Sequence, residues 1–178
     1  MRNRIAAIVA FGLSLLASTG GAAEDAAEAL SAVDPGDWVE LELIPDGERG
    51  WATREVDLKG RPKNDGGSVV GPFERTEDGG AVLGLRFDIT PETTVKDTLG
   101  ENIPAAELAA GEIVEVRLVR ESGRIQARKI RRLAPETPFE IEGSVENVSI
   151  ADPPTLRILN IEVTALNDVR VRRLHRRP

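Results

Sequence analysis

One stretch of this sequence occurs twice. Residues 82–95 read VLGLRFDITPETTV and residues 158–171 read ILNIEVTALNDVRV, and the two align without a gap at an offset of 76. A second pair, PGDWVELEL at residues 35–43 and AGEIVEVRL at residues 110–118, aligns at an offset of 75. Self-similarity at a fixed period marks a duplicated structural unit. We expect a repeated unit of about 75 residues, the size of one small β-barrel.

Glycine and asparagine occupy matching places in the two copies. Gly36 aligns with Gly111, and Gly84 aligns with Asn160. Both residue types tolerate a positive φ, which most other residues avoid. We therefore expect a bend or a bulge at Gly84 and at Asn160, and we take all four residues as structural positions of the repeat.

Alternation of apolar and polar residues predicts short β-strands. In residues 38–44 (WVELELI) valine and leucine alternate with glutamate, and residues 113–119 (IVEVRLV) show the same period. Clusters of Gly, Pro and Asp separate such segments, which indicates an all-β sandwich or barrel. Residues 103–110 predict a helical turn, and residues 24–32 (EDAAEALSA) fit either a short helix or an unfolded leader.

The frame of the repeat predicts the domain organisation. We call the piece around residues 82–95 the front half of the unit and the piece around residues 110–118 its back half, so the chain order is back, front, back, front. Residues 69–133 then form a complete module 1. Residues 34–58 are a separate back half, and residues 139–174 are a separate front half.

We expect the two separate halves to pair into module 2, which would be circularly permuted around module 1. Each half alone would be a small sheet with open edges, and isolated hairpins are marginally stable in water. The alternative is that each half docks on module 1 and extends its sheet. The fold class expected is therefore all-β, with two small OB-like barrels in tandem after a cleaved signal peptide.

Residues 1–23 have the pattern of an export signal. Two arginines precede an apolar run at residues 5–17, and small residues follow at residues 18–23. The run is shorter than the ~20 residues that span a bilayer, although a retained membrane anchor is the alternative. We expect cleavage after Ala23 and a periplasmic or secreted chain without a transmembrane segment. The chain has no cysteine, so no disulfide stabilises it.

Charge is distributed unevenly along the chain. Residues 24–115 carry 22 acidic and 8 basic residues, whereas residues 117–178 carry 8 acidic and 13 basic residues. Opposite signs favour contact between the two parts, or with an outside partner of matching sign. Nucleic acid is not an expected partner, because the chain is acidic overall and has few aromatic residues for base stacking.

Two segments resemble a known family. LAAGEIVEVRLVRESGRIQARKI at residues 108–130 resembles the back half of exported bacterial modules called domain of unknown function 5666, and IEGSVENVSIADPPTLRILNIEVT at residues 141–164 resembles their front half. The resemblance implies tandem OB-like barrels in secreted or periplasmic proteins. The family brings no known catalytic residue, and the sequence departs from its usual glycine at Asn160.

The sequence contains no catalytic, metal-binding or cofactor-binding motif. GxSxG, Walker, HExxH and Rossmann patterns are all missing. His175 is the only histidine, and no carboxylates cluster beside it to complete a zinc site. The carboxylates in glycine-rich turns lack the spacing of a calcium loop; they are Asp46, Glu48, Glu77 and Asp78. We expect no enzymatic activity, no cofactor and no bound metal.

Two tryptophans and the arginine-rich C-terminus are the candidate binding residues. Trp38 and Trp51 flank one predicted hairpin, and they fit either a platform for a sugar or a partner, or edge packing of the barrel, which is the commoner role. The basic stretches at residues 117–132 and 170–177 fit either a docking face for anionic groups or a solvated strand face. The C-terminal arginines are Arg170, Arg172, Arg173, Arg176 and Arg177.

The sequence therefore predicts a non-enzymatic exported module that binds or assembles an unknown protein or glycan of the cell envelope. The alternative is an envelope-surface protein whose arginine-rich tail binds anionic lipid or polysaccharide. Because a fold does not supply a function by itself, both hypotheses remain open at this point.

Overall fold

The computed structural model describes residues 20–47, 50–60 and 66–173. Most of the predicted signal peptide lies outside these residues, as do Glu48, His175, Arg176 and Arg177. The described part contains one α-helix, one 3-10 turn and a sheet of 11 strands. Their bounds are α1 Gly20–Leu30, β1 Trp38–Pro45, β2 Trp51–Lys59, β3 Ser68–Arg75, β4 Gly79–Val82, β5 Leu85–Asp88, β6 Thr94–Lys96, η2 Ala105–Glu107, β7 Ile113–Glu121, β8 Arg124–Arg132, β9 Phe139–Ser149, β10 Thr155–Ile158 and β11 Ile161–Arg173.

Strands β3, β4, β5, β7 and β8 close into a barrel. β3 pairs with β4, β4 with β5, β5 with β8, β8 with β7, and β7 again with β3. β6 adds a further parallel pairing to β8. The closed barrel and the all-β content confirm the predicted fold class. We call this unit barrel 1.

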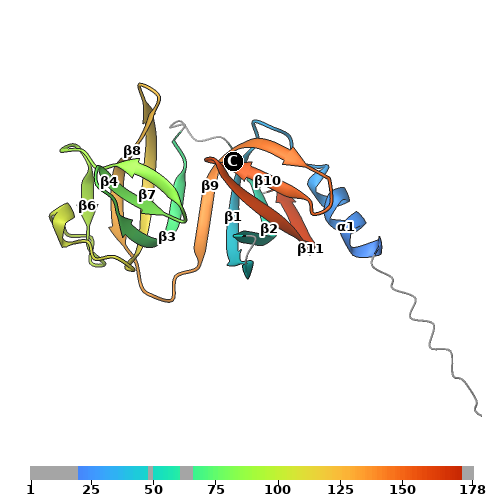
Figure 1. The fold of residues 1–178 in the computed structure, drawn as a ribbon, viewed down its shortest axis with the longest axis horizontal. Coiled ribbons are helices and arrows are strands. Elements are labelled where there is room, and N and C mark those ends of the chain that lie inside the picture. The colour runs from blue at the N-terminus through green and yellow to red at the C-terminus, as the bar shows by residue number, and fades with distance from the viewer. Residues whose placement is uncertain (1–19, 48–49, 61–65, 174–178) are drawn as a thin grey trace, which may run out of the picture.

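The remaining strands form a second cycle of pairings, which we call barrel 2. β9 pairs with β10, β10 with β11, β11 with β2, β2 with β1, and β1 with β9. The hairpin β1–β2 therefore lies among strands from the other end of the sequence (Figure 1). No helix in the described residues is long and apolar enough to cross a membrane.

The two cycles correspond strand by strand. β3, β4, β7 and β8 match β9, β10, β1 and β2, and β5 and β6 match two parts of the long β11. The register also repeats, because Val95 pairs with Ile130 in barrel 1 as Val171 pairs with Val56 in barrel 2. Circular permutation, with module bounds at residues 34–58, 69–133 and 139–174, stays our interpretation of this correspondence.

The same tight turn occurs at matching places in the two barrels. Leu83 and Gly84 have φ of 54° and 83°, and Leu159 and Asn160 have φ of 51° and 63°. Two consecutive residues at positive φ characterise the type I′ hairpin turn, which suits the twist of antiparallel strands. The bend expected at Gly84 and Asn160 is therefore a two-residue hairpin turn. Gly36 and Gly111 also have positive φ, just before β1 and β7.

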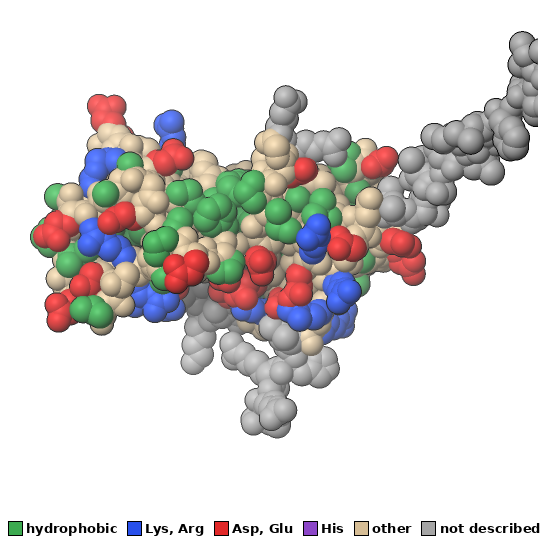
Figure 2. Space-filling view, turned by 90° about the horizontal axis from the view of Figure 1, so that it is seen from below, with side chains coloured by type: hydrophobic (Ala, Val, Ile, Leu, Met, Phe, Trp, Pro, Cys, Tyr) green, Lys and Arg blue, Asp and Glu red, His purple; other side chains and the backbone are tan. Residues whose placement is uncertain are grey.

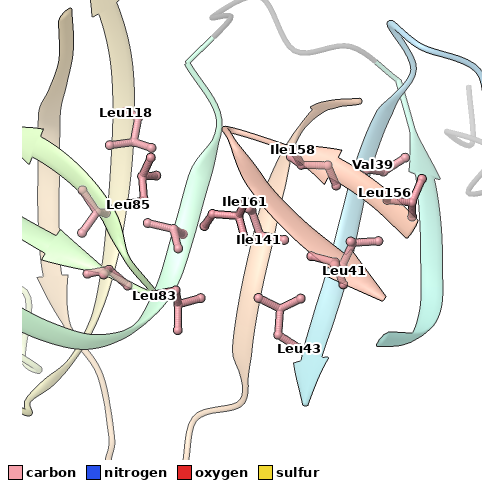
Figure 3. Packing of buried hydrophobic residues seen from close by; sticks show 14 of the residues in the cluster. Val39, Leu41, Leu43, Leu83, Leu85, Leu118, Ile141, Leu156, Ile158 and Ile161 are labelled. Carbon is pink, nitrogen blue, oxygen red and sulfur yellow. The ribbon is translucent and has the colours of Figure 1, made fainter. Parts of the chain in front are cut away.

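Each barrel has an apolar interior. Phe73 and Ile130 are fully buried in barrel 1, and Leu41, Ile141 and Leu156 are fully buried in barrel 2, where they point into the space between the strands (Figure 3). Alternate residues of each strand supply these side chains, as expected for strands with one face inward.

Helix α1 packs on barrel 2. It contacts β11, and its side chains Ala26 and Leu30 are fully buried. In barrel 1 the turn η2 and the buried Leu108 occupy the corresponding stretch, because Leu108 aligns with the buried Val33 at the offset of 75. Of the two sequence alternatives for residues 24–32, the structure therefore shows the helix.

Strands β3 and β9 join the two barrels. They pair antiparallel through Ser68 with Glu142, Val69 with Ile141, and Val70 with Glu140. The chains approach closely beside these pairs: a Cβ atom at Gly67 would lie 2.5 Å from the carbonyl oxygen of Glu142. Glycine at this position is therefore required by space as well as by its positive φ of 74°.

Packing of helix α1 should contribute to the stability of barrel 2. We expect Leu30→Ala to lower the free energy of unfolding by about 2–5 kcal/mol, because the removed side chain is fully buried. Urea unfolding followed by tryptophan fluorescence measures this, since Trp38 and Trp51 both lie in barrel 2. The matched control is Ala32→Ser, an exposed position beyond the helix, which should change stability by less than ~0.5 kcal/mol. Equal midpoints for the two variants would contradict the packing of α1.

Candidate binding site at the junction of the two barrels

One face of the sheet runs across both barrels in the order β6–β8–β7–β3–β9–β1–β2–β11. Residues directly opposite one another in neighbouring strands point to the same side of a sheet, so the register identifies the side chains of this face. One row crosses all eight strands: Thr94, Lys129, Arg117, Ser68, Glu142, Glu40, Asp57 and Arg172. We call this surface the junction face.

Corresponding positions of the two barrels carry opposite charges on this face. Equivalent residues of the two barrels differ by 74 or 75 in sequence number, as their shared register shows. At three such positions barrel 1 has a cation and barrel 2 has a carboxylate. The pairs are Arg117 with Glu42, Lys129 with Glu55, and Arg131 with Asp57. The duplicated surface therefore has a basic half and an acidic half. Figure 2 shows acidic and basic side chains at both ends of the molecule, and near the middle several acidic side chains beside a hydrophobic area.

A cleft of about 750 Å³ opens on the junction face. Barrel 2 contributes Trp38 and Glu142 to its lining, and β3 contributes Ser68. A smaller hollow of about 240 Å³ lies next to it, and the two share Ser68, Glu115 and Glu142. We call the larger one the junction cleft. Its remaining charged lining comes from barrel 1 and consists of Glu92, Lys96, Glu115, Arg117, Arg128 and Lys129.

Strands β1 and β9 form an acidic wall that extends from the cleft into the smaller hollow: Glu142 lines the cleft, and Glu40 and Glu140 line the hollow next to it. Glu40 lies directly opposite Glu142, and Glu42 lies directly opposite Glu140. Like charges in directly opposed positions are destabilising. Lys59 forms an ion pair with Glu40. Burial, together with the Glu40 and Glu42 carboxylates, raises the pKa of Glu140 above its usual value, and Lys59 only partly offsets this. The wall therefore has more negative charge than its own cations balance.

Part of the positive charge opposite this wall is neutralised within barrel 1. The Nε of Arg117 lies 3.0 Å from one oxygen of Glu115, and the Nη2 of Arg131 lies 3.0 Å from the other. Glu115 is thus held between two guanidinium groups. These two arginines and this glutamate form a local cluster that needs no ligand.

Three further cations form the basic wall of the cleft. Arg128 and Lys129 make no ion pair with a carboxylate in the described part of the chain, and both line the cleft. Lys96 donates a hydrogen bond from Nζ to the carbonyl oxygen of Gly100 at 2.8 Å. Glu92 also lines this side of the cleft, so the three cations leave the basic wall with a net positive charge.

The structure separates the two candidate tryptophans. Trp38 is 4% exposed, and its Nε1 donates a hydrogen bond of 2.8 Å to Oε1 of Glu142. Trp51 packs edge-to-face on Phe139, with 5.8 Å between ring centroids. They lie at opposite ends of the β1–β2 hairpin, because Trp38 pairs with Lys59 and Trp51 pairs with Pro45. They therefore form no common platform, and only Trp38 belongs to the cleft.

The described C-terminal arginines lie on β11, at the margin of the junction face away from the cleft. Arg172 forms an ion pair with Asp57, with 2.9 Å from Nε to Oδ1, and a second with Glu55. Burial and the Glu40 carboxylate raise the pKa of Asp57. Arg170 and Arg173 are exposed. The structure therefore places these arginines apart from the tryptophans.

The sequence did not reveal the acidic wall. Glu40, Glu42, Glu140 and Glu142 alternate with apolar residues, so the pattern indicated their outward direction. Their mutual approach depends on the pairing of β1 with β9, which joins segments about 100 residues apart. The basic wall lies partly in the stretch 117–132 that charge alone had indicated. In the described residues no group of three or more His, Cys, Asp or Glu is arranged to hold a metal ion.

The comparisons with known proteins give one result. Residues 76–131 match the family model described as Domain of unknown function (DUF5666). The matched segment covers β4 to most of β8 and thus includes the basic wall. No curated protein and no solved structure matches the chain.

The acidic wall predicts a pH-dependent stability. A carboxyl whose pKa is higher in the folded than in the unfolded state stabilises the fold below its usual value of 4.5, and this contribution is lost as pH rises through the raised pKa. We expect Glu140→Gln to be more stable than the wild type near pH 7 and similar to it near pH 4. Urea midpoints across this range measure the difference.

The control for this measurement is Glu136→Gln, because Glu136 is exposed in the linker between β8 and β9. It should follow the wild type at every pH. A Glu140→Gln variant that is less stable than the wild type at neutral pH would show that the ionised Glu140 carboxylate does not destabilise the fold.

Proposed function

We propose that this chain, whose residues 76–131 match the DUF5666 family model, is an exported, non-enzymatic binding module whose junction cleft holds a protein or glycan ligand. The observation that carries the proposal is that both barrels contribute charged side chains to one cleft of about 750 Å³. A concave site with a few convergent polar groups is the usual form of a ligand site.

An OB-like architecture supports this proposal. Barrel 1 contains β3, β4, β5, β7 and β8, which we number 1 to 5 here. Their order around the barrel is 1-2-3-5-4-1, and strands 3 and 5 are parallel. We interpret this order as OB-like, and OB-folds bind oligonucleotides and oligosaccharides. Because architecture alone does not supply a function, the proposal depends on the cleft and not on the fold.

Export and the lack of catalysis are supported by the sequence. Residues 1–23 have the basic, apolar and small-residue order of a signal peptide, which predicts a periplasmic or secreted protein. The chain contains no nucleophile, metal-binding or nucleotide-binding motif.

Filling the junction cleft with a large side chain tests the binding function. Ser68 lies on β3 in the lining of the cleft, so Ser68→Trp should fill it without changing the charge of either wall. We expect the wild-type protein to bind a defined set of ligands on arrays of glycans and peptides, and we expect Ser68→Trp to weaken that binding by about tenfold or more.

Ser149→Trp is the matched control, because Ser149 lies at the end of β9 outside the cleft lining. It should retain the ligands of the wild type, and thermal unfolding should show that both variants are folded. An array without ligands, or ligands that Ser68→Trp retains at full affinity, would refute the proposal.

The alternative function, binding of anionic surfaces through the C-terminal arginines, has one observation in its favour. Arg170 and Arg173 are exposed at the end of β11, and the sequence continues with further arginines. Each basic residue near an anionic membrane contributes about 1 kcal/mol of attraction. Sedimentation with phosphatidylglycerol vesicles should then decrease steeply with added salt.

The variant for this test is Arg173→Ser/Arg176→Ser/Arg177→Ser. Deletion from residue 170 onward is unsuitable, because residues 170–173 of β11 pair with β2. If the alternative holds, the triple variant loses vesicle binding and retains the array ligands of the wild type. Vesicle binding that is unchanged in the triple variant would exclude a role for the tail.

A further inference from the structure

We infer that the ligand of the junction cleft is an extended protein segment that carries an acidic and a basic side chain on the same face, about four residues apart. The inference rests on the proposed function, because it names the ligand class of the same cleft. It follows from the charges of the two walls, from the distance between them and from the burial of the aromatic residues.

The basic wall selects an anionic group. Arg128 and Lys129 have no carboxylate partner in the described part of the chain, and Lys96 uses one of its three donors on a carbonyl oxygen. A carboxylate placed over these residues gains charge-assisted hydrogen bonds, which are about twice as strong as neutral ones.

The acidic wall selects a cationic group. Two glutamate pairs face each other across β1 and β9, and Lys59 forms an ion pair with Glu40. Glu142 lines the cleft, and Glu140 lines the adjoining hollow. A lysine or arginine of a ligand placed between Glu140 and Glu142 would offset the repulsion between directly opposed carboxylates. A ligand with only one sign of charge would be attracted to one wall and repelled by the other.

The strand spacing sets the distance between the two charges. Lys129 on β8 and Glu142 on β9 are separated by β7 and β3, which is three steps of about 4.8 Å, or roughly 14 Å. An extended chain advances about 3.3–3.6 Å per residue, so this distance corresponds to about four residues. Residues i and i+4 of an extended segment point to the same side, so both can face the cleft.

The aromatic residues disfavour a neutral glycan. Sugar rings pack on exposed aromatic faces, but Trp38 is 4% exposed and its Nε1 is bonded to Glu142. Trp51 packs against Phe139 outside the cleft. A sulfated or carboxylated glycan would meet the basic wall well but would be repelled by the acidic wall. A mixed-charge protein segment satisfies both walls.

Wall reversal tests the inference through a change of preference. The probes are fluorescent serine–threonine peptides with Glu and Lys four positions apart (i and i+4), the same peptides with Glu and Lys three positions apart (i and i+3), all-Glu and all-Lys peptides, and sulfated dextran. The wild type should bind the four-position peptide about tenfold more tightly than any other probe in fluorescence anisotropy. The three-position peptide is the spacing control, because its charges point to opposite sides.

The two wall variants should then prefer opposite probes. Arg128→Glu/Lys129→Glu should prefer the all-Lys peptide, and Glu140→Lys/Glu142→Lys should prefer the all-Glu peptide. The control Arg86→Glu/Arg157→Glu reverses two exposed arginines on β5 and β10, outside the junction face, and should keep the wild-type preference. Unfolding lowers all affinities together and produces no such switch.

Three results would overturn the inference. Tightest binding of sulfated dextran, lost only on reversal of the basic wall, would identify a polyanion as the ligand. A salt-sensitive dimer of the wild type that either wall variant dissociates, without binding of the peptides, would identify a second copy of the chain. If the wall variants do not change their peptide preference, but Ser68→Trp still weakens binding of the array ligands, the cleft is a binding site and this ligand class is wrong. Failure of both tests would refute the proposed function as well.

Discussion

The antiparallel pairing of β3 with β9 is the constraint on which the junction face depends. Val69 and Ile141, opposite one another in this pairing, are both fully buried, so Ser68 and Glu142 beside them point outward. A shift by one residue would reverse this order and bury a glutamate in place of an isoleucine. Burial of Val69 and Ile141 therefore fixes the register between β3 and β9. That register then places the basic strands of one barrel beside the acidic strands of the other.

The repeat and the strand periodicity were sufficient to predict the fold class. Alternation in residues 38–44 reflects the inward direction of Val39 and Leu41, and the Gly84–Asn160 match reflects a hairpin turn with positive φ in both barrels. The helix at residues 24–32 could not be decided from the sequence, because helix formers alone are marginal over so short a segment. Burial of Leu30 against barrel 2 supplies the stabilisation that the local sequence lacks.

The candidate site was less accessible to sequence reasoning. Trp38 and Trp51 were candidate binding residues because they are aromatic. Their exposure depends on neighbours from distant segments, which are Glu142 for Trp38 and Phe139 for Trp51. The four glutamates of the acidic wall were recognised as outward-facing, and only the pairing of β1 with β9 brings them together. Pairing partners distant in sequence are not encoded in local periodicity. The uneven charge of residues 24–115 and 117–178 indicated a polarised molecule, and the register adds that equivalent positions of the repeat carry opposite charges.

The strand composition of barrel 2 also has a consequence for the order of folding. Barrel 1 is built from one continuous stretch, whereas barrel 2 needs β1 and β2 to meet strands that follow barrel 1 in the chain. Contacts between nearby residues form faster than contacts that close long loops. We therefore expect barrel 1 to close before barrel 2, whose β1–β2 hairpin has open edges until β9 to β11 pair with it. Closure of barrel 2 therefore requires segments from both sides of barrel 1 in the sequence to be present together.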